Sequence, residues 1–170
     1  GELVHFEVQL NQPGYIYLLW VNPDGTVSPL YPWDSGHARM GWDAPLLAES
    51  AVPRDRVMCP KSTADGFEAI EPTGLQTVVL AARRQPLTEG VDLAQLLNGL
   101  PSTPQLAMLS DTGPILRGVA TGQTKSIEDP QFDALKKRLS SHFELIRVVS
   151  FPQVSASSEK DSPAASINPD

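Results

Sequence analysis

Six residues between positions 34 and 59 carry the side-chain types that nucleophilic catalysis uses: Asp34, Ser35, His37, Arg39, Asp43 and Cys59. A Ser–His–Asp or Cys–His arrangement works only when the base lies within hydrogen-bond reach of the nucleophile. The spacing does not impose that geometry, and Asp-Ser-Gly around Ser35 is ordinary turn composition. Cys59 lies beside Met58 and Pro60, and a buried, inert thiol is the commoner case. A hydrolase or peptidase-like enzyme that uses the 33–60 loop is therefore the alternative interpretation, and no catalytic residue is assigned.

Metal and phosphate chemistry would need other patterns. The three histidines, at positions 5, 37 and 142, are far apart, and none forms a short-spaced ligand pair. The nearest approach to a phosphate-binding loop, at 118–122, has no lysine and no strand-to-helix context. We therefore predict no metal site and no cofactor.

Large aromatic side chains are the residues best suited to holding a protein partner. All three tryptophans lie between positions 20 and 42. Aromatic residues on loops can anchor a partner. The other interpretation, which the sequence favours, is that they pack on the open face or edge of a sheet, as is usual in small β domains. The candidate partner-binding residues are Trp20, Tyr31, Trp33, His37 and Trp42.

Length and charge exclude several classes of function. A chain of 170 residues suffices for one domain with a sizeable core. Its net charge is −7 and its 13 basic residues are mostly scattered, so nucleic acid and anionic membrane surfaces are not expected partners. No apolar run reaches membrane-spanning length, which predicts no direct membrane insertion by this segment. The lone cysteine leaves the compartment open. The start at Gly1-Glu2 shows no signal peptide and indicates a fragment of a longer protein, whose remaining part is free to carry a targeting signal.

A β-hairpin over 15–31 positions the aromatic residues. Residues 15–22 are rich in the aromatic and branched types that favour strands. Pro23-Asp24-Gly25 predicts a tight turn, because proline presets φ, Asp24 can bond nearby backbone and Gly25 tolerates positive φ. Residues 3–10 alternate between apolar and polar, and a turn is expected at 11–14, so the first three strands are predicted to form a meander. The 33–60 loop sustains no period, with short extended pieces expected at 51–52 and 56–59.

The second half alternates between strands and helices. Strands are predicted at 67–70, 75–84, 106–109, 115–119 and 145–151, and the apolar run at 75–84 suits a central strand. One helix is expected at 91–100, begun by Asp92. The other begins at Asp129-Pro130, and its apolar stripe consists of Phe132, Leu135, Leu139 and Phe143.

Together these elements predict an α+β fold. We expect a mostly antiparallel β-sheet domain, a sandwich or half-barrel, with two helices packed on it. The domain is expected to span 1–151, and 152–170 is expected to be a disordered tail because bulky apolar residues are almost absent there.

The first half of the chain resembles DUF4384, a bacterial family of domains of unknown function. In that family a strand with "GYLYL" leads through "DG" to "LYP" or "LFP", and a later strand ends in a small polar pair before "PL". The matching positions here are 13–17, 24–25, 30–32 and 74–87, within a resemblance that covers about 3–88. The sequence departs from the pattern at Gln76, where the family often has Glu, and at Ala82-Arg83, which replaces the small polar pair.

The second half, with 127–130, the basic helix and 147–151, is similar to the C-terminal ends of large planctomycete-type proteins in which this module follows a serine/threonine protein kinase domain. Related modules accompany caspase-like peptidase domains. The resemblance implies a non-catalytic accessory domain, sensory, regulatory or protein-binding, within a larger bacterial signalling protein. Its expected partner is another protein or another domain of the same chain, in the cytoplasm or the cell envelope.

Overall fold

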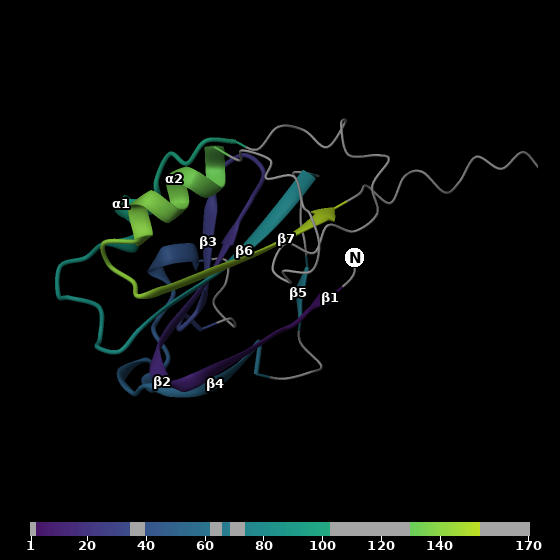
Figure 1. Cartoon of the computed structure of the whole chain (residues 1–170). Helices are drawn as coiled ribbons and strands as arrows, with labels where there is room; N and C mark the ends of the chain where they lie inside the picture. Colours follow the sequence, from purple (N-terminus) through teal and green to yellow (C-terminus); the bar gives the residue numbers. More distant parts are fainter. Residues whose placement is uncertain (1–2, 35–39, 62–65, 69–73, 103–129, 154–170) are drawn as a thin grey trace, which may run out of the picture.

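An antiparallel sheet with two helices on one of its faces makes up the structure, a computed structural model that describes residues 3–34, 40–61, 66–68, 74–102 and 130–153 (Figure 1). The strand order is β3-β2-β6-β7, and β4 also pairs with β2. A separate two-stranded pair joins β1 to β5. The mostly antiparallel α+β fold with two helices is therefore confirmed. The elements are β1 (Leu3–Val4), β2 (Phe6–Val21), β3 (Val27–Tyr31), the 3-10 helix η2 (Ala48–Ala51), β4 (Arg54–Cys59), β5 (Phe67–Glu68), β6 (Gly74–Arg83), α1 (Leu93–Leu97), α2 (Pro130–Leu139) and β7 (Leu145–Gln153).

The predicted hairpin turn between β2 and β3 is confirmed. Asn22 N donates to Thr26 O at 2.8 Å, and Gly25 N donates to Asn22 O at 2.9 Å. The carboxylate of Asp24 accepts from Thr26 N at 2.8 Å and from the Thr26 hydroxyl at 2.7 Å. Gly25 has a φ of 89°, which a residue with a Cβ rarely adopts. The hydrogen bonds that close this turn all join its own residues.

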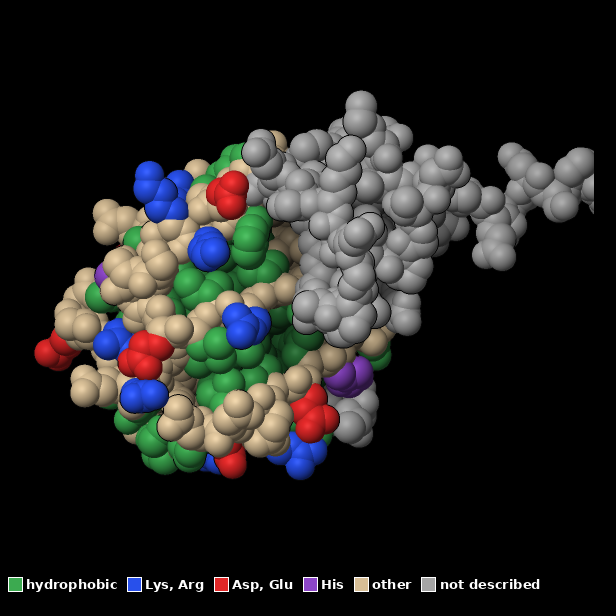
Figure 2. Space-filling model, viewed as in Figure 1, with side chains coloured by type: hydrophobic (Ala, Val, Ile, Leu, Met, Phe, Trp, Pro, Cys, Tyr) green, Lys and Arg blue, Asp and Glu red, His purple; other side chains and the backbone are tan. Residues whose placement is uncertain are grey.

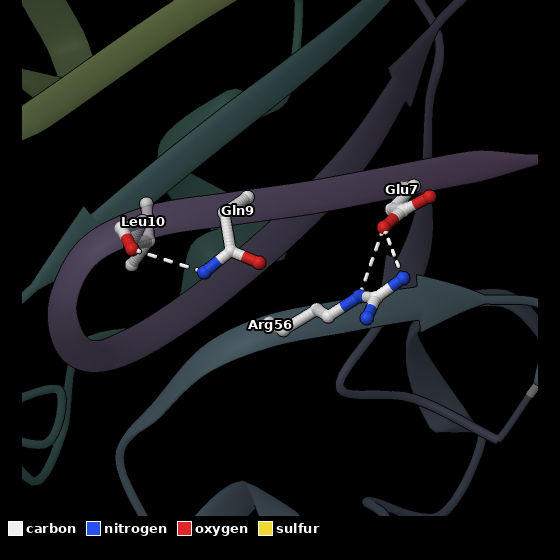
Figure 3. A network of polar contacts seen from close by, with 4 residues as sticks. All are labelled: Glu7, Gln9, Leu10 and Arg56. Atoms are coloured by element: carbon white, nitrogen blue, oxygen red, sulfur yellow. Dashed lines mark hydrogen bonds and ion pairs between the residues drawn. The ribbon is translucent and has the colours of Figure 1, made fainter.

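The predicted meander of three strands is wrong, because its first two strands are one strand. β2 runs through the expected turn at 11–14 and pairs first with β4, then with β3 and β6. Between the pairs Gln9–Arg56 and Gly14–Arg54, four residues of β2 lie opposite only one of β4, which is a large bulge. Figure 3 shows β2 curling back beyond this point. The chain bends at 11–14, but the strand that pairs with 6–9 comes from the 33–60 loop.

Arg56 of β4 holds the start of β2 through an ion pair with Glu7. Its Nε lies 2.8 Å and its Nη2 lies 2.6 Å from Oε1 of that carboxylate (Figure 3). Both side chains are more than half exposed, so the pair contributes little to stability. The ion pair is consistent with the register of β2 on β4 but adds little to the stability of that pairing.

Gly14 allows the bend in β2 to approach β6. A Cβ at this position would lie 3.1 Å from the carbonyl oxygen of Arg83. Glycine lacks that atom, so the two backbones can come close.

Two apolar clusters cover the two faces of the sheet. The helix-side cluster joins alternate residues of β2 and β6 to the helices; Leu19, Val79 and Leu139 are fully buried in it. The opposite cluster lies against the first half of β2 and β4, and includes Leu18, Trp20 and Val57. This alternation follows from the period of two in a strand.

β6 is the central strand that the sequence predicts. It lies between β2 and β7, and nearly every residue in it is buried. β7 pairs with it from Leu145 to Gln153, so the strand extends two residues past the expected domain boundary at 151.

The two helices are confirmed, with two corrections to the second. α2 ends at Leu139, so Phe143 of the predicted stripe lies beyond the helix, although it is buried. Asp92 caps α1 by accepting from Gln95 N at 3.1 Å. In α2, Phe132 is 37% exposed rather than part of the buried stripe, whereas Gln131 is buried. The Gln131 amide donates to Asn22 O at 3.1 Å and to Pro101 O at 2.9 Å, so a polar side chain takes the inward position.

The 33–60 loop is more ordered than its sequence suggests. β4 includes the extended piece expected at 56–59, and Trp33 forms an isolated bridge with Leu46. At 51–52 the expectation is only half right, because Ala51 closes η2 while Val52 has extended dihedrals. Of the strand expected at 67–70, the structure describes the first two residues, which form β5. The strands expected at 106–109 and 115–119, the helix start at Asp129 and the tail from 154 onward lie outside the described residues.

Candidate functional site

The aromatic residues that the sequence marks as partner-binding lie in two places. Trp20 and Tyr31 belong to the cluster opposite the helices, with 6% and 4% of their surfaces exposed. Trp33 is 9% exposed and belongs to the helix-side cluster, against which Trp42 packs half-buried. His37 lies outside the described residues. The four described aromatic side chains thus form no common surface, and their role in binding stays a prediction.

Trp20 has all the contacts of a core residue. Its indole Nε1 donates to Oε1 of Gln76 at 2.8 Å, a buried hydrogen bond. The ring lies edge-on to Phe6 and Phe151, with centroids 5.8 and 5.5 Å away. Aromatic pairs of this geometry add to the stability that burial provides.

Trp42 is the most accessible of the four. It meets Trp33 edge-on at a centroid distance of 5.3 Å, and Trp33 in turn meets Tyr17 at 6.4 Å. The indole of Trp42 therefore covers the outer end of the helix-side cluster. A partner could reach this ring but not the three buried ones without moving the core.

Cys59 lacks the properties of a nucleophile. Its side chain is buried, and Sγ lies 3.5 Å from the carbonyl oxygen of Leu30. Burial, with a smaller contribution from the charge of Glu49, raises the pKa of this thiol to about 12. Ser35, His37 and Arg39 lie outside the described residues. Within the described ranges, no group of three or more His, Cys, Asp or Glu could hold a metal ion.

We expect the Cys59 thiol to resist iodoacetamide in the folded chain at pH 7.5 and to react within minutes in 6 M guanidinium chloride. The thiolate reacts, and burial suppresses it in the folded state. Mass spectrometry counts the alkylated fraction. Because the pKa is higher in the folded state than the ordinary 9.0, this thiol should cost stability as the pH rises from about 9 to 12. Rapid alkylation of the native chain would contradict this reading of the site.

One accessible apolar side chain in the middle of a strand lies on β7. Because β6 and β7 pair in register, Arg147 lies beside Leu80 and Val149 lies beside Val78 on the face opposite the helices. Val149 is 45% exposed, although it sits in the middle of a strand. The β7 edge surface is defined here by Leu80, Leu145, Arg147, Val149 and Phe151. Figure 2 shows a band of hydrophobic side chains with Lys or Arg groups on it, below α2 and above the β2–β4 ribbon.

β7 is the last strand of the sheet, and its outer edge pairs with no strand that the structure describes. An edge strand presents unpaired N–H and C=O groups to any extended chain that approaches. Charged residues usually protect such edges, yet from Leu145 to Phe151 the only charged residue is Arg147. The sequence predicts the strand correctly but not its edge position, which depends on how the other strands are ordered.

Comparisons of the chain with family models, with curated proteins and with solved structures found no match. Neither helix in the described part of the chain is long and apolar enough to cross a bilayer. The resemblance to DUF4384 is thus carried by the quoted motifs alone.

Proposed function

We propose that this chain is a non-catalytic interaction domain of a larger bacterial signalling protein, as the resemblance to the kinase-associated DUF4384 family implies. Its ligand is an extended peptide segment of another protein or of another domain of the same chain, which adds as a strand to the outer edge of β7. The observation that carries the proposal is the long β7 edge, with Val149 exposed and no strand beside it among the described residues.

Strand addition suits the chemistry of this edge. Main-chain hydrogen bonds supply affinity, and alternate side chains of the added strand supply specificity. The side chains that would contact it are apolar at Val149 and Phe151 and positive at Arg147. Partners directly opposite one another across two strands interact most strongly. An added segment should therefore place an apolar residue opposite Val149 and an acidic residue opposite Arg147.

The two positions fix the spacing of the peptide motif. Arg147 and Val149 are two residues apart on one face of β7, so their partners are two residues apart as well. An antiparallel segment would read apolar-x-acidic from its N-terminus, and a parallel segment would read acidic-x-apolar.

Selection of random ten-residue peptides on the 170-residue chain should enrich one of these two motifs. The V149K variant of the chain should bind the selected peptide about tenfold or more weakly, a loss near 1.4 kcal/mol. The reason is that an ammonium group replaces the apolar contact. R147E should reverse the preference from acidic to basic peptides. Fluorescence anisotropy of a labelled peptide measures both effects.

V52K is the matched control, since Val52 is 54% exposed and is not part of the β7 edge surface. It should bind the selected peptide as the unchanged chain does. Equal affinities of V149K and V52K would refute strand addition at β7, as would a selected motif without an acidic residue.

A further inference from the structure

Three strands of the large sheet, β3, β4 and β7, have a neighbouring strand on one side only among the described residues. β3 carries Pro29 at its centre, which has no N–H to donate, and β4 begins with the charged run at 54–56. β7 is the longest of the three, at nine residues, and its only charged residue is Arg147. Its proline, Pro152, is next to last and leaves 145–151 able to pair. β7 is therefore the least protected of these edges.

β7 is complementary to a second copy of itself. Val149 is the midpoint of Leu145–Gln153, so a two-fold axis at Val149 pairs every residue of the strand with a residue of the other copy. Val149 then lies opposite Val149 of the second copy. This side chain is 45% exposed in the single chain, and the pairing gives it an apolar neighbour. A two-fold axis at any other residue shortens the overlap.

The same register also suits the one charge of the strand. Arg147 lies opposite Phe151 of the second copy, and a guanidinium group beside an aromatic ring is an attractive pair. The two Arg147 side chains are offset along the strands by the distance from 147 to 151, about 13 Å, which exceeds the Debye length of about 8 Å in physiological salt. An axis at Arg147 would instead place two guanidinium groups opposite one another, which is destabilising.

We propose that two copies of this chain form a dimer through their β7 strands, antiparallel and with Val149 opposite Val149. The inference rests on the proposed function, because the dimer covers the edge that a peptide needs and so regulates access to it. The second copy supplies the apolar residue opposite Val149 but a phenylalanine, not an acid, opposite Arg147. A peptide with the acidic residue makes the ion pair that the dimer lacks, and it therefore displaces the second copy.

The dimer is expected to be weak. A single pair of strands buries less surface than the roughly 1,200–2,000 Å² of a stable interface. We expect a dissociation constant on the order of 100 μM, in the range of transient contacts. A weak dimer is what displacement requires, because a peptide can then compete at a modest concentration.

Sedimentation velocity of the 170-residue chain tests the proposal. The chain should be mostly dimeric at about 500 μM and mostly monomeric at about 5 μM. V149K should raise the dissociation constant of the dimer about tenfold or more, because it places two ammonium groups opposite one another at the axis. V52K is the control and should dimerise as the unchanged chain does, since Val52 is equally exposed but is not part of β7.

Cross-linking with a short bismaleimide tests the register, and it also serves if V149K does not fold. V149C should become a covalent dimer, because the two new thiols lie opposite one another across the axis. V52C should not, and neither should the unchanged chain, whose one thiol, Cys59, is buried.

The outcomes separate this inference from the proposed function. A chain that stays monomeric at about 500 μM, equal dissociation constants of V149K and V52K, or equal cross-linking of V149C and V52C would each overturn the dimer, even if the selected peptide binds at β7. The selected peptide should convert the dimer to a peptide-bound monomer. A dimer that V149K disrupts and the peptide does not would confirm pairing through β7 and refute the addition of the peptide there.

Discussion

Replacing Trp20 with alanine should lower the free energy of unfolding by about 3–5 kcal/mol, the usual cost of truncating a buried aromatic side chain. The ring is 6% exposed and contacts the rings of Phe6 and Phe151. Its removal leaves a cavity in the cluster opposite the helices and breaks the 2.8 Å hydrogen bond to Gln76. Urea unfolding followed by circular dichroism measures the change.

The matched control is W42A. Trp42 is only half-buried and packs at the edge of the helix-side cluster, so its loss should cost clearly less stability. The comparison also tests the two interpretations of the aromatic residues. If W20A were as stable as the unchanged chain but lost binding to a partner, Trp20 would be a binding residue. The conclusion that its side chain stabilises the core would then be wrong.

Replacing Gly25 with alanine should cost about 2–5 kcal/mol, the sum of two effects. A φ of 89° strains any residue with a Cβ, by about 1–2 kcal/mol. The new methyl group would also clash with the backbone of Leu100, and overpacking of this kind costs about 1–3 kcal/mol. The β2–β3 turn lies against the backbone of the segment after α1, at Leu100 and Pro101. Thermal unfolding of the variant measures the loss.

G90A separates the two effects. Gly90 has nearly the same φ, at 90°, but a Cβ there would meet no atom within 4 Å. It should lose only the conformational part, about 1–2 kcal/mol. Equal losses in G25A and G90A would show that the turn does not press against Leu100.

The parts of the fold that local chemistry determines could be predicted from the sequence. Pro23-Asp24-Gly25 makes its own turn hydrogen bonds, and Asp92 caps the helix that it precedes. The apolar run of β6 indicates a central strand because both its faces need cover. In each case the residues that determine the structure lie next to one another.

The sequence-based predictions fail where residues distant in the sequence determine the local structure. The turn expected at 11–14 became a bulge because β4, about fifty residues later, supplies the pairing strand. Gln131 is buried in place of Phe132 because Asn22 O and Pro101 O accept from its amide. A helical stripe read from hydrophobicity alone cannot include such acceptors.

The candidate sites were missed for the same reason. Tryptophans that cluster along the chain are separated in space, since Trp20 and Trp33 face opposite sides of the sheet. Val149 looks like any strand residue until the strand order places β7 at an edge.

The pairing of β6 with β7 also determines when the domain can complete itself during synthesis. About sixty residues separate the end of β6 from the start of β7. At about 5–20 residues per second, a ribosome needs roughly 3–12 s to add them. For that interval the apolar strand β6 has β2 on one side and no β7 on the other. The unpaired edge of β6 in the nascent chain can then pair with strands of other chains. We therefore expect chaperone dependence to be greatest before position 153 has left the exit tunnel.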